Sequence, residues 1–166
     1  MNCLSFDVGG TTVKYGVIDE SYKILKKDKI PTPENENDFI YSLSNIIQEN
    51  LSIISKVSVA MPGYVNSANN KYLYGPHLKY DIDFSKLSNF TDYKFHLDND
   101  GNVAAYCEYF LNYKTKYSNL IMLTFGTGVG GGIISEGRLL RGRGNAGEIG
   151  HLSLIHISEP TRRTII

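Results

Sequence analysis

Two glycine-rich turns in this chain have the composition of sites that bind phosphate. Residues 7–12 read DVGGTT, and residues 126–130 read GTGVG. Each turn stands between two apolar runs, which predicts a β-hairpin in both places. We expect the second turn to need backbone conformations that residues with a Cβ avoid. Exposed amides in such turns form a concave anion site, so two hairpins of this design can bind one polyphosphate between them. The alternative is that each is an ordinary turn.

Asp7, Thr11 and Thr12 offer groups for a nucleotide phosphate and its metal ion. A carboxylate beside a glycine turn can hold hydrated Mg²⁺, because this ion favours one or two carboxylates together with water and phosphate oxygens. The threonine hydroxyls and the amides of Gly9 and Gly10 can bind the phosphates themselves. In the alternative interpretation, Asp7 only caps backbone amides of the turn.

Asp100 is the candidate general base, since LDNDGN places it where a predicted strand gives way to a predicted helix. A carboxylate there can accept the proton of a substrate hydroxyl that attacks a phosphoryl group. Its ordinary pKa of about 4 keeps it ionised at neutral pH. Asn99 can hydrogen-bond the hydroxyls of the same substrate. The alternative is that Asp100 serves as an N-cap of the helix.

Glu148 and His151 are three residues apart, which places them on one face if they lie on a helical turn. A carboxylate and an imidazole suit the vicinal hydroxyls of a sugar, and the imidazole can also bind a metal ion. The alternative is an exposed pair on a loop.

The elements that must position these groups begin with a meander and continue with alternating strands and helices. We expect strands at 2–6, 13–18, 22–30, 56–61, 93–97, 120–124 and 129–134. We expect helices from a cap at Asn37 or Asp38 to about Asn50, over one or two turns within 83–90, and at 103–111. The first helix has Phe39, Leu43, Ile46 and Ile47 on one face. Residues 67–79 are expected to form a loop or short hairpin. This order predicts a mixed sheet covered by helices.

The composition of the 166 residues is that of a soluble globular protein. Seventeen basic and 17 acidic side chains cancel, so nothing points to a nucleic-acid or membrane partner. No apolar run is long enough to cross a bilayer, and MNCLSFDVGG lacks the charged and apolar regions expected of a signal peptide. Cys3 and Cys107 lack the spacing of metal ligands, and we expect them to be small buried apolar residues. These features predict a reduced, cytoplasmic setting.

Three segments together resemble the ROK family of repressors and sugar kinases. DVGGTTVKYGVID resembles the first phosphate motif of actin-like sugar kinases, and LDNDGNVAAYCE resembles the catalytic strand and helix of the family. GTGVGGGIISEGRLLRGRGNAGEIGH is similar to the family signature. The resemblance implies an α/β, actin-like (ribonuclease H-like) ATPase fold with a mixed β-sheet flanked by helices. It implies an N-terminal domain at 1–117 and only the beginning of a second, actin-like domain at 118–151.

The resemblance also implies a function, the ATP- and Mg²⁺-dependent phosphorylation of a hexose or hexosamine by a protein that is a homodimer at full length. It makes Asp100 the base, and it makes Asn99, Asp100, Glu148 and His151 the sugar contacts. It assigns the nucleotide and its metal to Asp7, Gly9, Gly10, Thr11, Thr12, Lys14, Gly126, Thr127, Gly128 and Gly130. In the full-length protein it implies a structural Zn²⁺ at His151, completed by downstream cysteines.

Some positions depart from the family pattern. Gly101 stands where alanine is usual, and Pro76-His77-Leu78 replaces the Pro-Asn-Leu of many glucokinases. PGYVN replaces PGPVD, so the identity of the sugar stays open. Alternatives within the family are a sugar-responsive transcriptional regulator and a non-catalytic sugar-binding relic. A regulator carries a helix-turn-helix segment before the first phosphate motif, for which we expect no room ahead of Asp7.

The last 15 residues, 152–166, depart from the pattern completely. LSLIHISEPTR resembles the translation of a transposase adapter used in sequencing libraries, so we expect this tail to be non-native. The family's second domain closes over ATP and sugar, and closure excludes water from the reaction. We therefore expect the chain as written to be inactive, although the complete gene would encode a kinase.

Overall fold

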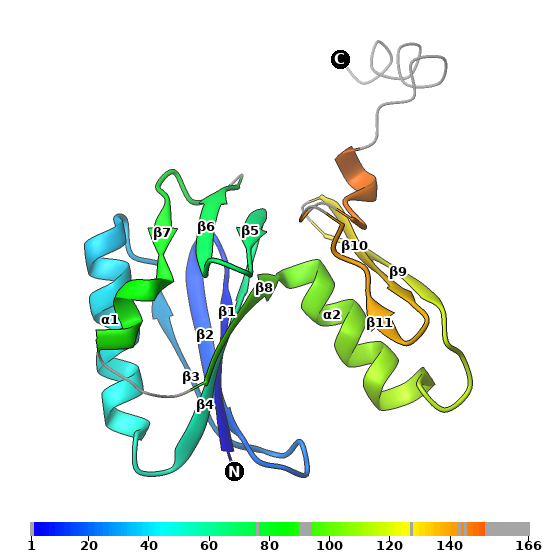
Figure 1. The fold of residues 1–166 in the computed structure, drawn as a ribbon. Helices are drawn as coiled ribbons and strands as arrows, with labels where there is room; N and C mark the ends of the chain where they lie inside the picture. Colours follow the sequence, from blue (N-terminus) through cyan, green and yellow to red (C-terminus); the bar gives the residue numbers. More distant parts are fainter. Residues whose placement is uncertain are drawn as a thin grey trace. The chain divides into compact units, whose positions relative to one another are not determined.

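The computed structural model describes residues 2–75, 77–89, 94–126, 128–142, 144 and 146–151, with the side chains of residues 88, 89 and 151 left aside. The chain divides into two compact units, Met1–Val103 and Ala104–Ile166 (Figure 1). Each unit contains part of the predicted site.

The first unit is built on a mixed five-stranded sheet with the order β3-β2-β1-β4-β8. Its strands are β1 (Asn2–Val8), β2 (Thr12–Ile18), β3 (Ile24–Pro31), β4 (Ile54–Met61) and β8 (Lys94–Asn99). The first three strands are antiparallel, whereas β1, β4 and β8 run parallel. The predicted meander and mixed sheet are therefore confirmed. Because β1, β4 and β8 are parallel, their carboxyl ends meet at one edge, and Asp7 and Asn99 lie there.

Helix α1 (Glu36–Asn50) covers one face of this sheet (Figure 1). Its predicted apolar face is buried, with Phe39, Leu43 and Ile47 fully inaccessible. Alternate strand residues complete the core: Leu4, Phe6, Val8, Val13, Val17, Val57, Val59, Met61 and Leu97. The predicted caps were wrong, because the N-cap is Asn35, whose side chain accepts a hydrogen bond from the Asp38 amide over 2.9 Å.

A second, three-stranded sheet in the same unit consists of β5 (Tyr64–Asn66), β6 (Lys71–Tyr74) and β7 (Ile82–Asp83). The segment predicted as a loop or short hairpin is thus a hairpin between β5 and β6. A 3₁₀ helix, η1 (Phe84–Asn89), follows β7 and forms the expected helical turns.

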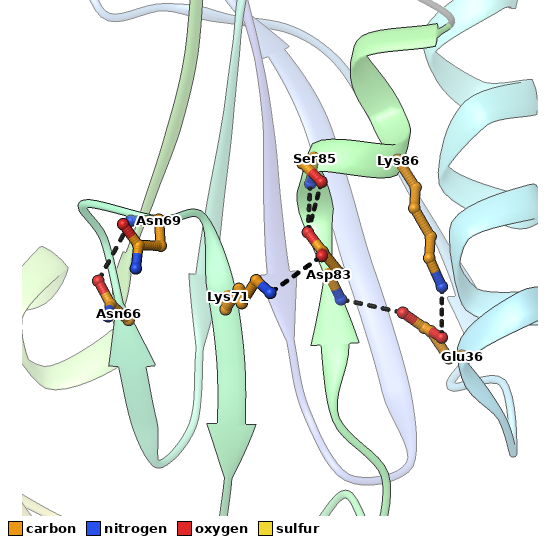
Figure 2. A network of polar contacts seen from close by, with 7 residues as sticks. All are labelled: Glu36, Asn66, Asn69, Lys71, Asp83, Ser85 and Lys86. Atoms are coloured by element: carbon orange, nitrogen blue, oxygen red, sulfur yellow. Dashed lines mark hydrogen bonds and ion pairs between the residues drawn. The ribbon is translucent and has the colours of Figure 1, made fainter.

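Polar contacts fasten this small sheet to the beginning of α1 (Figure 2). The Lys71 Nζ lies 3.2 Å from a carboxylate oxygen of Asp83. The Asp83 amide donates to Glu36 over 3.0 Å, and the Lys86 Nζ lies 2.6 Å from the second carboxylate oxygen of Glu36. One glutamate therefore links the helix to both β7 and η1. Figure 2 also shows the Asn69 amide donating to the Asn66 side chain in the turn between β5 and β6.

Helix α2 (Asp100–Glu108) begins directly after β8 and continues into a π-helical turn, Tyr109–Tyr113. It starts three residues earlier than the predicted 103–111. The cause is Asn99, whose side-chain oxygen accepts a hydrogen bond from the Asn102 amide over 3.1 Å and so begins the helix. Cys107 is exposed on this helix, contrary to the prediction of a buried residue, and Cys3 is half-buried.

The second unit contains the predicted glycine hairpin, with β9 (Leu120–Phe125) pairing antiparallel to β10 (Val129–Ser135). The short strand β11 (Arg138–Leu139) adds to β10, and the chain continues to a 3₁₀ turn, η3 (Ile149–His151). The turn at the hairpin tip was expected to need special backbone conformations, and its two described glycines do not show them. Gly126 and Gly128 do not have positive φ, whereas Gly137 and Gly147, farther along, do.

Candidate active site

The first glycine turn joins β1 to β2 and leaves two amides available. The Gly9 amide donates to the Thr12 carbonyl over 3.0 Å, and Thr32 donates from its hydroxyl to the Gly9 carbonyl and from its amide to the Thr11 carbonyl. Within the described part of the chain, no hydrogen bond uses the amides of Gly10 and Thr11. Adjacent unpaired amides are what an anion-binding turn requires, so this turn fits a nucleotide phosphate.

Asp7 and Lys14 are cross-strand partners beside this turn. The Lys14 Nζ lies 3.9 Å from an Asp7 carboxylate oxygen, and 63% of the Asp7 side chain is exposed. No cluster of three or more metal-binding side chains occurs among the residues that the structure describes. A single accessible carboxylate suits Mg²⁺ that keeps most of its water, so Asp7 fits a hydrated ion held together with phosphate oxygens.

Asn99 lies at the end of β8 and is only 7% exposed. Its side-chain nitrogen donates to the Gly63 carbonyl over 3.0 Å, while its oxygen accepts from the Asn102 amide. Asn99 therefore caps α2, the role considered above as the alternative for Asp100. It retains one donor hydrogen and one lone pair, so the predicted contact to a substrate hydroxyl stays chemically available.

Asp100 is the first residue of α2, and its carboxylate accepts a hydrogen bond from the Gly101 amide over 2.8 Å. Desolvation raises the pKa of the Asp100 carboxyl above its ordinary value, and the negative charge of Asp7 raises it further. The Gly101 amide and the charge of His77 oppose this rise. The residue as a whole remains exposed, so a hydroxyl can reach it. The ordinary pKa assumed from the sequence was therefore too low.

The glycines of the second unit differ in their surroundings. Gly126 and Gly128 are exposed at the hairpin tip, and a Cβ on Gly126 would meet nothing within 4 Å. A Cβ on Gly131 would lie 2.5 Å from the Met122 carbonyl oxygen and 3.2 Å from that of Gly147. A Cβ on Gly150 would overlap the backbone of β10. The close approach of Gly147 to Gly131 and Gly132, and of Gly150 in η3 to Val129, therefore holds the end of the signature segment on β10.

The structure brings one part of the predicted site together in the first unit: Asp7, Gly9, Gly10, Thr11, Thr12, Lys14, Asn99 and Asp100. Gly126, Gly128, Gly130 and the half-buried Glu148 belong to the second unit. Thr127 and the side chain of His151 lie outside the described residues. The predicted roles of this second set stay predictions.

Sequence reasoning missed His77 as a member of the first group. Its charge acts on Asp100, and its side chain contacts Gly10 so closely that a Cβ there would lie 2.8 Å from the His77 Cβ. The only available signal was the departure from Pro-Asn-Leu at Pro76-His77-Leu78. That departure was interpreted only in terms of sugar identity.

The sheet order and the site define an α/β domain of the actin-like ATPase class, and comparison with known proteins agrees. A glucokinase of Streptomyces griseus, solved in complex with glucose and AMPPNP, superposes with a TM-score of 0.80 and is 28% identical, covering 94% of this chain and 52% of that one. The ROK family model matches residues 3–162. The chain therefore belongs to the ROK family.

Its relatives include sugar kinases with different substrates in their names. A glucokinase of Streptomyces coelicolor is 31% identical over 158 residues, which are 92% of this chain and 50% of that protein. An N-acetylmannosamine kinase of Vibrio cholerae is 32% identical over 160 residues, which are 93% of this chain and 55% of that protein. The chain thus spans about half the length of the curated relatives it matches. None of its described helices is long and apolar enough to span a membrane.

Proposed function

We propose that this chain is part of an ATP-dependent kinase that phosphorylates a hydroxyl of a hexose or hexosamine. One observation carries the proposal: a turn with two unpaired amides, at Gly10 and Thr11, shares an edge of the sheet with the Asp100 carboxylate. The sugar and nucleotide bound to the Streptomyces griseus relative are the reactants that such a pair of groups requires. The alternatives, a regulator and a sugar-binding relic, would not need an accessible base beside the turn.

In the proposed reaction, Asp100 accepts the proton of the sugar hydroxyl as the oxygen attacks the terminal phosphorus of ATP. A new oxygen–phosphorus bond forms, and ADP leaves with the electron pair of the broken bond. The amides of Gly10 and Thr11, with the hydroxyls of Thr11 and Thr12, hold phosphate oxygens. Bound Mg²⁺ supplies charge neutralisation, and Asp7 would hold it through water.

The raised pKa of Asp100 suits this role. A base accepts a proton more readily when its pKa is higher, provided that it remains ionised at the working pH. Desolvation and Asp7 both raise the Asp100 pKa, while His77 limits the rise. The site therefore strengthens Asp100 as a base relative to a carboxylate in water.

The second unit contributes the remaining groups of the proposal. Gly126, Thr127, Gly128 and Gly130 bind the nucleotide, while Glu148 and His151 join Asn99 as contacts to the sugar. His151 also binds Zn²⁺ in the complete protein, which is a cytoplasmic homodimer. We place the domain boundary at residue 117, the start of the second domain at 118–151, and a non-native tail at 152–166. The 166-residue chain, which spans about half of its relatives, is proposed to be inactive.

A coupled assay of ADP release tests this function. The complete gene product is tested with glucose, N-acetylglucosamine, N-acetylmannosamine, fructose and a β-glucoside, and the 166-residue chain is tested beside it. We expect one of these sugars to stimulate ADP release by the complete product and none to stimulate the short chain. Failure of every sugar would refute the kinase function, and turnover by the short chain would refute its proposed inactivity.

A further inference from the structure

His77 packs directly against the first phosphate turn. A Cβ built on Gly10 would lie 2.8 Å from the His77 Cβ, 3.1 Å from its Cγ and 3.3 Å from its Nδ1. This approach is possible only because Gly10 has no side chain. The imidazole therefore borders the turn whose Gly10 and Thr11 amides are available to a phosphate.

The loop that carries His77 is fixed on both sides, while His77 itself is exposed. On one side, Leu78 is buried and its carbonyl accepts a hydrogen bond from the Tyr72 hydroxyl over 3.4 Å. On the other, a Cβ on Gly75 would lie 2.5 Å from that hydroxyl and 3.2 Å from the Gly63 Cα. Burial raises the pKa of Tyr72 to about 12, so the donor proton is retained at neutral pH. His77 is thus a positioned side chain that a ligand can reach.

His77 and a charged group of the proposed site, Asp7, both act electrostatically on Asp100. The charge of His77 lowers the pKa of Asp100, while the charge of Asp7 raises it. Lys14 lies 3.9 Å from Asp7 on the neighbouring strand. In the reaction, the phosphoryl group moves from the turn to a hydroxyl at Asp100. His77 borders the turn at Gly10 and acts electrostatically on Asp100.

We propose that His77 is a further catalytic residue, whose imidazole donates a hydrogen bond to an oxygen of the phosphoryl group in transfer. This inference rests on the proposed kinase function. His77 forms no covalent bond: Asp100 takes the hydroxyl proton, ADP takes the electron pair of the broken bond, and His77 stabilises charge on a phosphoryl oxygen. The contact with Gly10 favours a phosphate over a sugar as the partner of the ring, since the neighbouring amides also select an anion.

Steady-state kinetics of the complete gene product test this role. His77→Ala removes the donor, His77→Asn keeps a nitrogen donor near the Nδ1 position, and His96→Ala removes an exposed histidine of β8 as the matched control. We expect His77→Ala to lower kcat about 10- to 100-fold with the KM for the sugar unchanged. His77→Asn should retain an intermediate kcat, and His96→Ala the wild-type kcat. An unchanged kcat in His77→Ala, or a rise only in the KM for the sugar, would overturn the assignment.

A binding measurement separates this inference from the kinase function itself. The imidazole resonances of His77, identified by their loss in His77→Asn, are followed in the complete protein as AMPPNP, AMP or glucose is added. We expect a shift with AMPPNP and none with AMP or glucose. No shift with AMPPNP, or a shift with glucose alone, would contradict the phosphate contact. If no sugar stimulates ADP release, the proposed function fails, and this titration still tests His77.

Discussion

The side-chain nitrogen of Asn99 donates to the carbonyl of Gly63 over 3.0 Å, and this bond connects the last residue of β8 to the loop after β4. The oxygen of the same side chain caps α2 through the Asn102 amide. Asn99 therefore fixes the backbone on both sides of Asp100, the candidate base. The stability of this edge of the sheet depends on one buried amide.

Replacing Asn99 with alanine should lower the free energy of unfolding of the 166-residue chain by about 1–3 kcal/mol. The substitution removes an N-cap and leaves the Gly63 carbonyl without its partner. Urea unfolding followed by circular dichroism measures the change. Asn69→Ala is the matched control, because Asn69 is exposed and its hydrogen bond to the Asn66 side chain uses only its backbone amide. Equal midpoints for the two variants would show that the Asn99 contacts do not stabilise the fold.

Replacement by alanine should lower the free energy of unfolding at one glycine of the second unit and leave it almost unchanged at another. Gly131→Ala would force a Cβ to within 2.5 Å of the Met122 carbonyl oxygen, and overpacking of this kind costs about 1–3 kcal/mol. Gly126→Ala should change the free energy of unfolding by less than about 0.5 kcal/mol, because a Cβ there meets nothing within 4 Å. Thermal unfolding of both variants measures the difference. A larger loss for Gly126→Ala would refute this account of the hairpin.

The Glu36 network in Figure 2 should contribute to stability in a pH-dependent way. The hydrogen bond from the Lys86 side chain is the main cause of a lowered pKa for Glu36, followed by the hydrogen bond from the Asp83 amide and then by the charge of Lys86. Because the folded chain holds the Glu36 proton less tightly than the unfolded chain, this stabilisation is present above the unfolded pKa of about 4.3 and is lost as pH falls through the folded value.

Glu36→Gln should therefore cost about 0.5–1 kcal/mol at pH 7 and low salt, and less at high salt. Below the folded pKa of Glu36 the variant and wild type should have the same stability. Urea midpoints across this pH range provide the measurement, with the exposed Glu34→Gln as control. A cost that persists unchanged at low pH would exclude the ion pair as its cause.

Asp100 should show the opposite pH dependence. Its folded pKa is raised, so the folded chain binds this proton more tightly than the unfolded chain does. The stabilisation that comes from tighter proton binding at Asp100 is thus fully present below the unfolded pKa of about 4. It is lost as pH rises through the folded pKa. Asp100→Asn should be more stable than wild type at pH 7, with the difference disappearing near pH 3. A variant less stable than wild type at pH 7 would contradict the inferred desolvation.

The sequence predicted the elements of the fold better than the contacts of the site. Alternation in β1 and β2 and the apolar face of α1 reflect burial, which is a local pattern with a fixed period. The cap of α2 could not be chosen in the same way, because Asp98, Asn99 and Asp100 are all good caps. Only the register of β8 in the sheet decides that Asn99 turns inward and Asp100 follows it into the helix.

The missed part of the site depends on contacts between distant segments. Gly10 and His77 meet because the loop after β6 folds over the turn between β1 and β2, and no local pattern records such a contact. The same reason explains part of the close packing at Gly131, a glycine of β10 beyond the turn whose backbone conformation the sequence was used to predict. Gly131 is required by two backbone carbonyls, that of Met122 on the partner strand and that of Gly147, a residue outside the hairpin.

The most direct test of the kinase proposal is the rate of sugar-dependent ADP release by the complete gene product with Asp100→Asn. Asn keeps the shape and the helix-start hydrogen bond but cannot accept the hydroxyl proton. We predict a loss of kcat of at least about 100-fold with sugar binding retained, while the exposed control Asp81→Asn keeps the wild-type rate. Wild-type turnover by Asp100→Asn would contradict the account.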